Sequence, residues 1–237
     1  MTYSKDFFKD YFGDKDSDHL KIHRGNQEAY EDNFSDLWPA NKNAKILEIG
    51  CGAGQFLHYL KLKGYCNLEG VDIGEAQIDF LKKMDIKGCL ISSISEFLSG
   101  KKEQYDIIVM NHVIEHLLKS ELLPSLRTIY YSLKNKGVFI YATPNTACIS
   151  GLFQRYIDFT HEVGFTERSA YEVMRIAGFR DIMVRGDRIR LKFRPKRILW
   201  WMLNKLWYKL LGFIYYIERG TDRPRVLSRE LIVIGKK

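Results

Sequence analysis

The stretch that decides the fold is KILEIGCGAGQF, residues 45–56. A short apolar run that passes directly into three glycines is typical of a buried strand followed by a tight turn. The residues after the glycines have the apolar spacing of a helix. Because such a turn brings backbone N–H groups and a helix N-terminus close to a ligand, the stretch predicts a binding site at its glycines.

The alternation of apolar runs and helical patterns continues along the chain to residue 142. Buried parallel strands consist of near-continuous apolar runs, and they need helical connections. We therefore expect an α/β fold in which helices cover both faces of a parallel sheet. The predicted strands are 45–49, 67–72, 87–91, 105–110 and 137–142, and the predicted helices are 55–63, 75–84, 94–98 and 115–132, the last with a break at Pro124.

The segments on either side of this core follow other patterns. Residues 26–37 predict a helix that stops at Trp38-Pro39. We expect residues 1–44 to form an N-terminal helical cap on a domain of residues 45–237. The other predicted elements are an irregular insertion at 145–165, a helix at 167–177 closed by Gly178, strands at 180–185 and 230–234 paired antiparallel at the sheet edge, and a second insertion at 191–219.

Charge is distributed unevenly along the chain, whose net charge is +8. Residues 185–237 hold 15 Lys and Arg but only 4 Asp and Glu, whereas residues 1–184 hold 22 and 25. The basic excess therefore lies in the last quarter, among many aromatic residues. This composition indicates an acidic partner such as anionic lipid, nucleic acid or a phosphorylated substrate.

The chain is long enough for one sizeable α/β domain. Its polar N-terminus lacks a basic flank followed by an apolar run, so we expect no secretory signal. The cysteines lack metal-ligand spacing, and we expect reduced core thiols in a cytoplasmic protein. They are Cys51, Cys66, Cys89 and Cys148.

Two acidic residues define the ligand expected at the glycine turn. Asp72 ends the second predicted strand, 18 residues after Gly54, where a carboxylate can accept hydrogen bonds from both hydroxyls of a ribose. Glu48 lies two residues before the first glycine, where it would repel a pyrophosphate and attract a cation. S-Adenosylmethionine, which carries an ammonium and a sulfonium group, fits these charges better than a dinucleotide does.

Four segments, in the order ILEIGCGAGQF, GVDIGEAQI, YDIIVMNHVIEHL and GVFIYATPN, resemble the successive motifs of class I S-adenosylmethionine-dependent methyltransferases. The resemblance covers residues 45–145. It implies a Rossmann-like, mostly parallel seven-stranded sheet whose last strand is antiparallel, with S-adenosylmethionine as the cofactor.

The resemblance also implies a role for each motif residue. Glu48 and the glycine turn would hold the amino-acid part of the cofactor, Asp72 the ribose and Ile73 the adenine. Many members place an Asp after the third strand, where this chain has Ser92-Ser93, so that contact would fall to a hydroxyl or the backbone. The expected cofactor-binding residues are Glu48, Gly50, Cys51, Gly52, Gly54, Asp72, Ile73, Ser93, Ile94 and Asn111.

Candidate general bases follow the fourth predicted strand, at the edge where open sheets bind ligands. They are His112 and His116, with Glu115 between them. Related quinone-type methyltransferases carry a Glu-x-x-Glu-His cluster here that can hold a divalent metal. Because His112 replaces the first Glu, we expect no metal. In the alternative interpretation, Glu115 and His116 only cap a helix and orient the loop.

A second catalytic candidate is the pair Asp158 and His161 in the 145–165 insertion. Paired, they could form a carboxylate-oriented imidazole that removes a proton from a sugar hydroxyl. Alternatively, they belong to a surface loop in which Asp158 and Thr160 cap turns. The run D-x-T-H-E-x-x-F-T from Asp158 resembles methyltransferases of bacterial surface-polysaccharide and lipopolysaccharide O-antigen synthesis. This resemblance implies a sugar hydroxyl as the acceptor.

The segment ILWWMLNKLWYKLLGFIYYI, residues 198–217, is nearly all apolar. Two internal lysines disfavour a membrane span, whereas the Trp and Tyr residues with basic flanks favour a helix at the membrane surface through 195–219. That contact would place the enzyme on the inner face of the cytoplasmic membrane, beside a lipid-linked glycan. The alternatives are a lid over the active site, a homodimer face or a true span.

The favoured function is an O-methyltransferase that acts on a sugar hydroxyl of a surface glycan or its precursor. The alternatives are an O-methyltransferase for a small aromatic or quinone-like acceptor, a nucleic-acid methyltransferase, and a non-catalytic cofactor-binding protein. A nucleic-acid partner is disfavoured, because Asn111-His112-Val113-Ile114 stands where base methyltransferases often carry a Pro-Pro-Tyr/Phe-type motif. Trp and Leu between the basic charges also suit lipid better than a phosphate groove.

Overall fold

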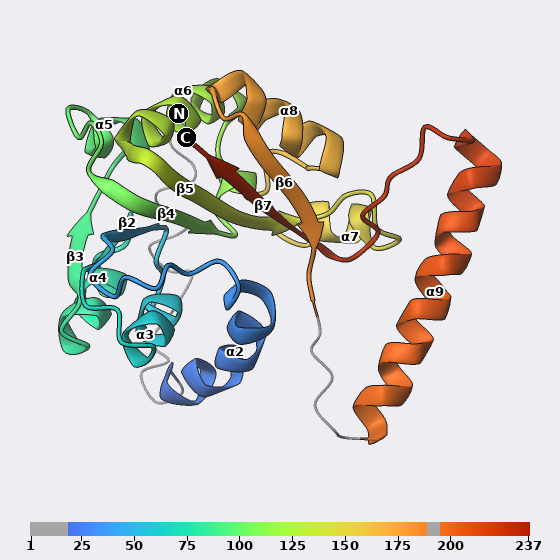
Figure 1. Ribbon diagram of the computed structural model, residues 1–237, viewed down its shortest axis with the longest axis horizontal. Helices are drawn as coiled ribbons and strands as arrows, with labels where there is room; N and C mark the ends of the chain where they lie inside the picture. Colours follow the sequence, from blue (N-terminus) through green and yellow to red (C-terminus); the bar gives the residue numbers. More distant parts are fainter. Residues whose placement is uncertain (1–18, 189–194) are drawn as a thin grey trace.

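The computed structural model describes residues 19–188 and 195–237. The expected cap at 1–44 is therefore described only from His19, and residues 191–194 of the second insertion lie outside the described residues. One sheet runs through the molecule, in the order β3-β2-β1-β4-β5-β7-β6 (Figure 1). Strands β1 to β5 are parallel, and β7 is antiparallel to both β5 and β6. The expected Rossmann-like α/β fold with an antiparallel last strand is confirmed.

The elements alternate along the chain much as the apolar runs predicted. The strands are β1 Ile46–Ile49, β2 Leu68–Asp72, β3 Lys87–Leu90, β4 Tyr105–Asn111, β5 Leu133–Pro144, β6 Asp181–Gly186 and β7 Glu230–Lys236. The helices are α2 His19–Phe34, α3 Gln55–Leu62, α4 Glu75–Lys83, α5 Ile94–Leu98, the 3₁₀ turn η1 Ile114–His116, α6 Lys119–Ser132, α7 Gly151–Tyr156, α8 Glu167–Ala177 and α9 Pro195–Arg219.

Two apolar cores lie on the two faces of the sheet, because successive strand residues point to opposite faces. In β5, Phe139 and Tyr141 pack with α5, α6 and α8. Ile140 and Ala142, which alternate with them, pack with α2, α3 and α4. The central strands are thus buried on both sides, which explains their continuous apolar sequences.

Two expected helix boundaries were wrong. Helix α2 ends at Phe34 and not at Trp38, whose ring folds back to lie 5.5 Å from that of Phe56. The expected break at Pro124 lies instead at Leu117–Leu118, where the backbone is extended, and Pro124 lies inside α6. Helix α2 thus ends before its expected breaker, whereas α6 continues through Pro124.

Other expectations need smaller corrections. The 145–165 insertion is not wholly irregular, because it contains α7. All four cysteines are free, as expected, but Cys66 is exposed, since it lies in the turn before β2 with its thiol near Asn43. From Pro195 onward, the last insertion forms one long helix, α9. Within residues 19–188 and 195–237, no helix combines the length and apolarity needed to cross a membrane.

Candidate active site

A cavity of about 930 Å³ lies at the carboxyl ends of β1 and β4. The strand order reverses between these two strands, which is where open α/β sheets bind ligands. The cavity brings together nearly all of the residues expected from the sequence to bind cofactor or acceptor. Those that line it are Glu48, Gly50, Cys51, Gly52, Asp72, Ile73, Ser93, Ile94, Asn111, His112, Glu115, His116, Asp158 and His161.

The glycine turn needs glycine for conformation and for space. Gly50, Gly52 and Gly54 have φ angles of 69°, 50° and 75°, which side chains disfavour. A Cβ on Gly50 would also lie 2.2 Å from Cγ2 of Val113. Gly54 is not among the cavity-lining residues; a Cβ there would meet Leu81 at 2.5 Å, so this glycine lets α3 approach α4 closely.

Asp72 fixes the turn from the neighbouring strand. Its carboxylate accepts hydrogen bonds from the backbone N–H of Gly52 at 2.9 Å and of Gly74 at 3.1 Å. Burial raises the pKa of Asp72, while these hydrogen bonds oppose the rise. Each carboxylate oxygen keeps a further lone pair, so the side chain can also accept hydrogen bonds from ribose hydroxyls.

Glu48 is a deeply buried acidic group of the cavity, at 3% exposed. Its Oε1 accepts a hydrogen bond from Nδ2 of Asn111 at 3.3 Å. In the described part of the chain, Oε2 of Glu48 and Oδ1 of Asn111 are buried without a hydrogen-bond partner. Burial, with the nearby Asp72, raises the pKa of Glu48 well above its usual range. An ammonium group would satisfy both orphaned acceptors, so the residues present fit S-adenosylmethionine.

The part of the cavity where the adenine is expected lacks the usual acidic residue. Ile73 and Ile94 provide apolar walls there. The hydroxyl of Ser93 accepts from the backbone N–H of Glu96 and caps α5, while that of Ser92 donates to the Glu96 carboxylate at 2.8 Å. The two serine hydroxyls that replace the Asp therefore bond to the first turn of α5.

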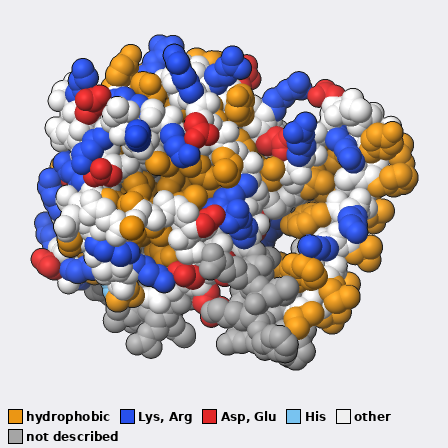
Figure 2. All heavy atoms as spheres, viewed as in Figure 1, with side chains coloured by type: hydrophobic (Ala, Val, Ile, Leu, Met, Phe, Trp, Pro, Cys, Tyr) orange, Lys and Arg blue, Asp and Glu red, His pale blue; other side chains and the backbone are white. Residues whose placement is uncertain are grey.

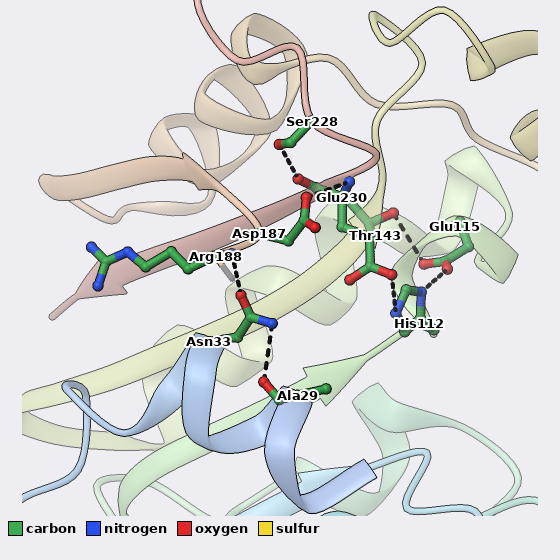
Figure 3. A network of polar contacts seen from close by, with 9 residues as sticks. All are labelled: Ala29, Asn33, His112, Glu115, Thr143, Asp187, Arg188, Ser228 and Glu230. Atoms are coloured by element: carbon green, nitrogen blue, oxygen red, sulfur yellow. Dashed lines mark hydrogen bonds and ion pairs between the residues drawn. The ribbon is translucent and has the colours of Figure 1, made fainter. Parts of the chain in front are cut away.

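Among the cavity residues expected near the acceptor, His112 lies between two carboxylates (Figure 3). Its Nδ1 is 3.3 Å from Oε1 of Glu115, and its Nε2 is 3.7 Å from Oε1 of Glu230. Burial disfavours the imidazolium, but the two carboxylates outweigh it and raise the pKa of His112 to about 9. The raised pKa favours the imidazolium, whereas a general base must be the neutral imidazole.

His116 is oriented by a chain of polar groups from the 145–165 insertion. Its Nδ1 is 2.8 Å from Oγ1 of Thr160, whose hydroxyl donates to Oδ1 of Asp158 at 2.7 Å. Because Thr160 donates to Asp158, it accepts from His116 Nδ1–H, and the lone pair of this tautomer is on Nε2. Burial lowers the pKa of His116, so its imidazole is neutral at pH 7.

His161 lies beside His116, with ring centroids 4.8 Å apart. Its Nδ1 is 2.9 Å from the backbone oxygen of Gln154, which can only accept, so this tautomer also has its lone pair on Nε2. The structure thus contains an imidazole oriented by the Asp158 carboxylate, but this imidazole is His116 and not the expected His161. The Asp158 carboxylate acts on His116 through Thr160, whereas a carbonyl orients His161.

The two groups of catalytic candidates, one after β4 and one in the 145–165 insertion, come together through the backbone of Glu115. Its carbonyl accepts hydrogen bonds from the N–H groups of Glu162 and Val163, which dock the insertion against η1. Ligand atoms of Glu115, His116 and His161 lie within 4.8 Å of one another, an arrangement that could hold a metal ion. Spacing along the chain did not predict this cluster.

Several cavity residues were missed from the sequence. Glu230 is the most informative, because it begins β7 opposite Pro144 at the end of β5. The antiparallel return of β7 carries its carboxylate to the carboxyl edge of the parallel strands, so the predicted strand pair contained the signal. Gln154 of α7, Gln77 of α4 and Tyr30 of α2 also line the cavity, and no sequence pattern predicted this.

Known protein families and proteins include relatives of this chain. The model of a family described as "Methyltransferase domain" matches residues 22–202. A carboxy-S-adenosyl-L-methionine synthase from Nautilia profundicola is 31% identical over 52% of this chain and 56% of its own length. A ubiquinone biosynthesis O-methyltransferase from Bartonella quintana is 32% identical over 44% of this chain and 42% of its own. The chain spans about half the length of these curated relatives.

The fold has counterparts among solved structures. A SAM-dependent methyltransferase from Archaeoglobus fulgidus superposes with a TM-score of 0.65, covering 92% of this chain and 94% of its own at 20% identity. The fold and the cavity at the reversal of strand order define an enzyme of the Rossmann-like methyltransferase class. The chain belongs to the methyltransferase domain family, and its cavity residues fit S-adenosylmethionine as the cofactor.

Proposed function

We propose that this methyltransferase transfers a methyl group to a hydroxyl of a sugar, in a lipid-linked glycan that is a precursor of a surface polysaccharide such as O-antigen. The observation that carries the proposal is the pair of imidazoles at one end of the cavity. His116 and His161 are each held at Nδ1, which leaves the lone pairs on Nε2. Glu48, whose acceptors fit the cofactor ammonium, lines the same cavity.

The residues at the acceptor end can then have separate roles in the reaction. When bound, S-adenosylmethionine supplies an electrophilic methyl group that passes to the acceptor oxygen. His116 Nε2 accepts the proton that this oxygen loses, since the imidazole is neutral at pH 7. The hydroxyl of Thr160 and the carboxylate of Asp158 hold the resulting imidazolium in place. His161 positions the acceptor hydroxyl.

A sugar suits the lining of this end of the cavity. Polyols are bound by side chains that accept and donate several hydrogen bonds at once. The lining offers Ser120, Glu121, Gln154 and Glu230 for this purpose, with cationic His112 between two carboxylates. The run of residues 158–166 that resembles O-antigen methyltransferases supplies Thr160 and His161 to the site, which further supports a glycan acceptor.

A second candidate acceptor is a quinone-like phenol. The similarity to a ubiquinone biosynthesis O-methyltransferase favours it, as does the cluster of Glu115, His116 and His161. A phenol loses its proton far more readily than a sugar hydroxyl, so it depends less on a general base. The two candidates therefore differ in how strongly turnover depends on His116.

The test is transfer of a labelled methyl group to cell-extract fractions. We expect label in the lipid-linked glycan fraction, and about 10²–10⁴-fold less of it with His116→Ala. His161→Ala should reduce turnover without weakening cofactor affinity. Label confined to the quinone fraction would favour the second candidate. Label in nucleic acid, or in no fraction despite cofactor binding, would contradict both.

A further inference from the structure

Helix α9 carries an apolar stripe that faces away from the rest of the protein. Its stripe residues recur at intervals of three and four, so they share one face of the helix. All are exposed; Leu206, for example, is 66% exposed. The α9 stripe consists of Leu199, Leu203, Leu206, Leu210, Phe213 and Ile217.

The opposite face of α9 contacts the body of the protein. Leu211 is buried, and the hydroxyl of Tyr215 donates to the backbone oxygen of Ala147 at 2.8 Å. The guanidinium of Arg223 donates to the backbone oxygen of Gly212 at 2.7 Å. These contacts fix the orientation of the helix, and they leave the α9 stripe pointing outward.

The apolar surface of α9 is too wide for a coiled-coil seam. Trp200, Trp207 and Ile214 flank the stripe on one side and Met202 extends it on the other, and all four are exposed. At 3.6 residues per turn, the apolar arc covers roughly 160° of the helix. A two-stranded coil buries a narrower seam and places charges beside it. The six positions that flank the α9 stripe hold a single charged residue, Lys209, and no acid. They are Trp200, Met202, Trp207, Lys209, Ile214 and Tyr216.

The charge around the stripe favours an anionic partner over a second copy of this chain. Lys205, Lys209 and Arg219 are exposed on α9, against a single acid, Glu218. Figure 2 shows hydrophobic side chains along α9 at the right of the view, with Lys and Arg among them. Two such helices facing each other would repel, whereas anionic lipid headgroups would attract them. Trp and Tyr prefer the same headgroup level.

A second exposed apolar surface lies at the rim of the cavity. We call residues 149–159, which include α7, the rim segment. Leu152, Phe153 and Phe159 in this segment are 63–87% exposed, whereas Gln154 and Ile157 line the cavity. In Figure 1, α7 lies between the end of the sheet and α9. The Tyr215–Ala147 hydrogen bond joins α9 to the chain just before this segment.

We propose that α9 lies flat on an anionic lipid surface, with its stripe among the headgroups and the rim segment as a second contact. An amphipathic helix with a wide apolar face, aromatic residues and basic flanks binds membranes in this way. Contact through the rim segment, whose Gln154 and Ile157 line the cavity, would bring the mouth of the cavity to the lipid surface. There it would receive an acceptor that is anchored in the membrane, and this last step rests on the proposed function.

The test is co-sedimentation of the full chain with vesicles, without any acceptor. We expect binding to vesicles of phosphatidylcholine with about 30% phosphatidylglycerol, weaker binding to phosphatidylcholine alone, and release by high salt. The variant Leu206→Asp/Phe213→Asp should bind the anionic vesicles at least about tenfold more weakly. Lys205→Glu/Lys209→Glu should lose the preference for anionic lipid. The matched control is Leu62→Asp/Ile176→Asp, which alters exposed apolar residues on α3 and α8 and should bind normally.

Calorimetric affinity for S-adenosylmethionine verifies the fold of each variant, so failed folding is recognised directly. This readout also separates the membrane proposal from the proposed function, which can fail without affecting vesicle binding. Equal binding of the stripe variant and the control would overturn the proposal, as would no binding of the natural chain to anionic vesicles. A dimer in light scattering that Leu206→Asp/Phe213→Asp dissociates would assign the stripe to a second copy instead.

Discussion

The Nδ1 atom of His116 lies 2.8 Å from the hydroxyl oxygen of Thr160, 44 residues further along the chain. Because that hydroxyl donates to Asp158, it fixes which imidazole nitrogen keeps the lone pair. Thr160 is therefore a positioning residue for the candidate base.

Thr160→Val should lower kcat by about 10- to 100-fold, since the imidazole loses the partner that orients it. The KM for the cofactor should not change, and Thr160→Ser, which keeps the hydroxyl, should restore most of the rate. Steady-state kinetics of both variants check this. A Ser variant as slow as the Val variant would show that the hydroxyl does not orient the base.

His112 should make stability depend on pH. Its pKa is raised to about 9 from an ordinary 6.5, so the charged pair with Glu115 contributes fully below pH 6.5. This contribution is lost as the pH rises through 9. Urea unfolding at pH 6 and pH 9.5 should show a larger loss for the natural chain than for His112→Asn. Asn tolerates the left-handed backbone at this position, where φ is 53°. Equal losses of stability would show that the His112–Glu115 ion pair does not cause the pH dependence.

Asp72 and Asp79 provide a matched pair of carboxylates. Asp72→Ala should weaken cofactor binding by about 1–3 kcal/mol, because it removes the acceptor of the Gly52 and Gly74 N–H groups and of the ribose hydroxyls. Asp79 is exposed on α4 and pairs only with Lys82 in the described structure, so Asp79→Ala should bind normally. Calorimetry measures both. Equal affinity of the two variants would place the ribose elsewhere.

Chelation separates the two candidate acceptors. If His116 accepts the proton and His161 positions the sugar hydroxyl, EDTA should leave turnover unchanged. If Glu115, His116 and His161 instead hold a divalent ion, EDTA should abolish turnover, and added Mg²⁺ or Zn²⁺ should restore it. The second outcome would favour the quinone-like acceptor and contradict our expectation of no metal.

The cofactor half of the site could be predicted because its residues follow strand ends that the sequence marks. Glu48 and Asp72 lie in or at the end of buried apolar strands, and parallel strands place such ends at one edge of the sheet. The fold was predictable for the same reason. Local signals misplaced two helix boundaries, those expected at Trp38 and at Pro124.

The acceptor half depends on contacts that local pattern does not encode. Thr160 reaches His116 only because the insertion docks on the backbone of Glu115. Glu230 reaches His112 only through the return of β7 beside β5. The apolar composition of α9 was evident from the sequence, but which face points away from the protein is fixed by tertiary contacts such as that of Tyr215.

The central claim is that the cavity above β1 binds S-adenosylmethionine, with Glu48 at its ammonium. Calorimetry should show binding of S-adenosylmethionine and S-adenosylhomocysteine but not of NAD. Because the pKa of Glu48 is raised, binding should release a proton and tighten as the pH rises. Glu48→Gln should weaken binding by about 1.5–3 kcal/mol and abolish the proton release. If the natural chain binds neither the cofactor nor its demethylated product, or if Glu48→Gln binds as tightly and with the same proton release, the account is contradicted.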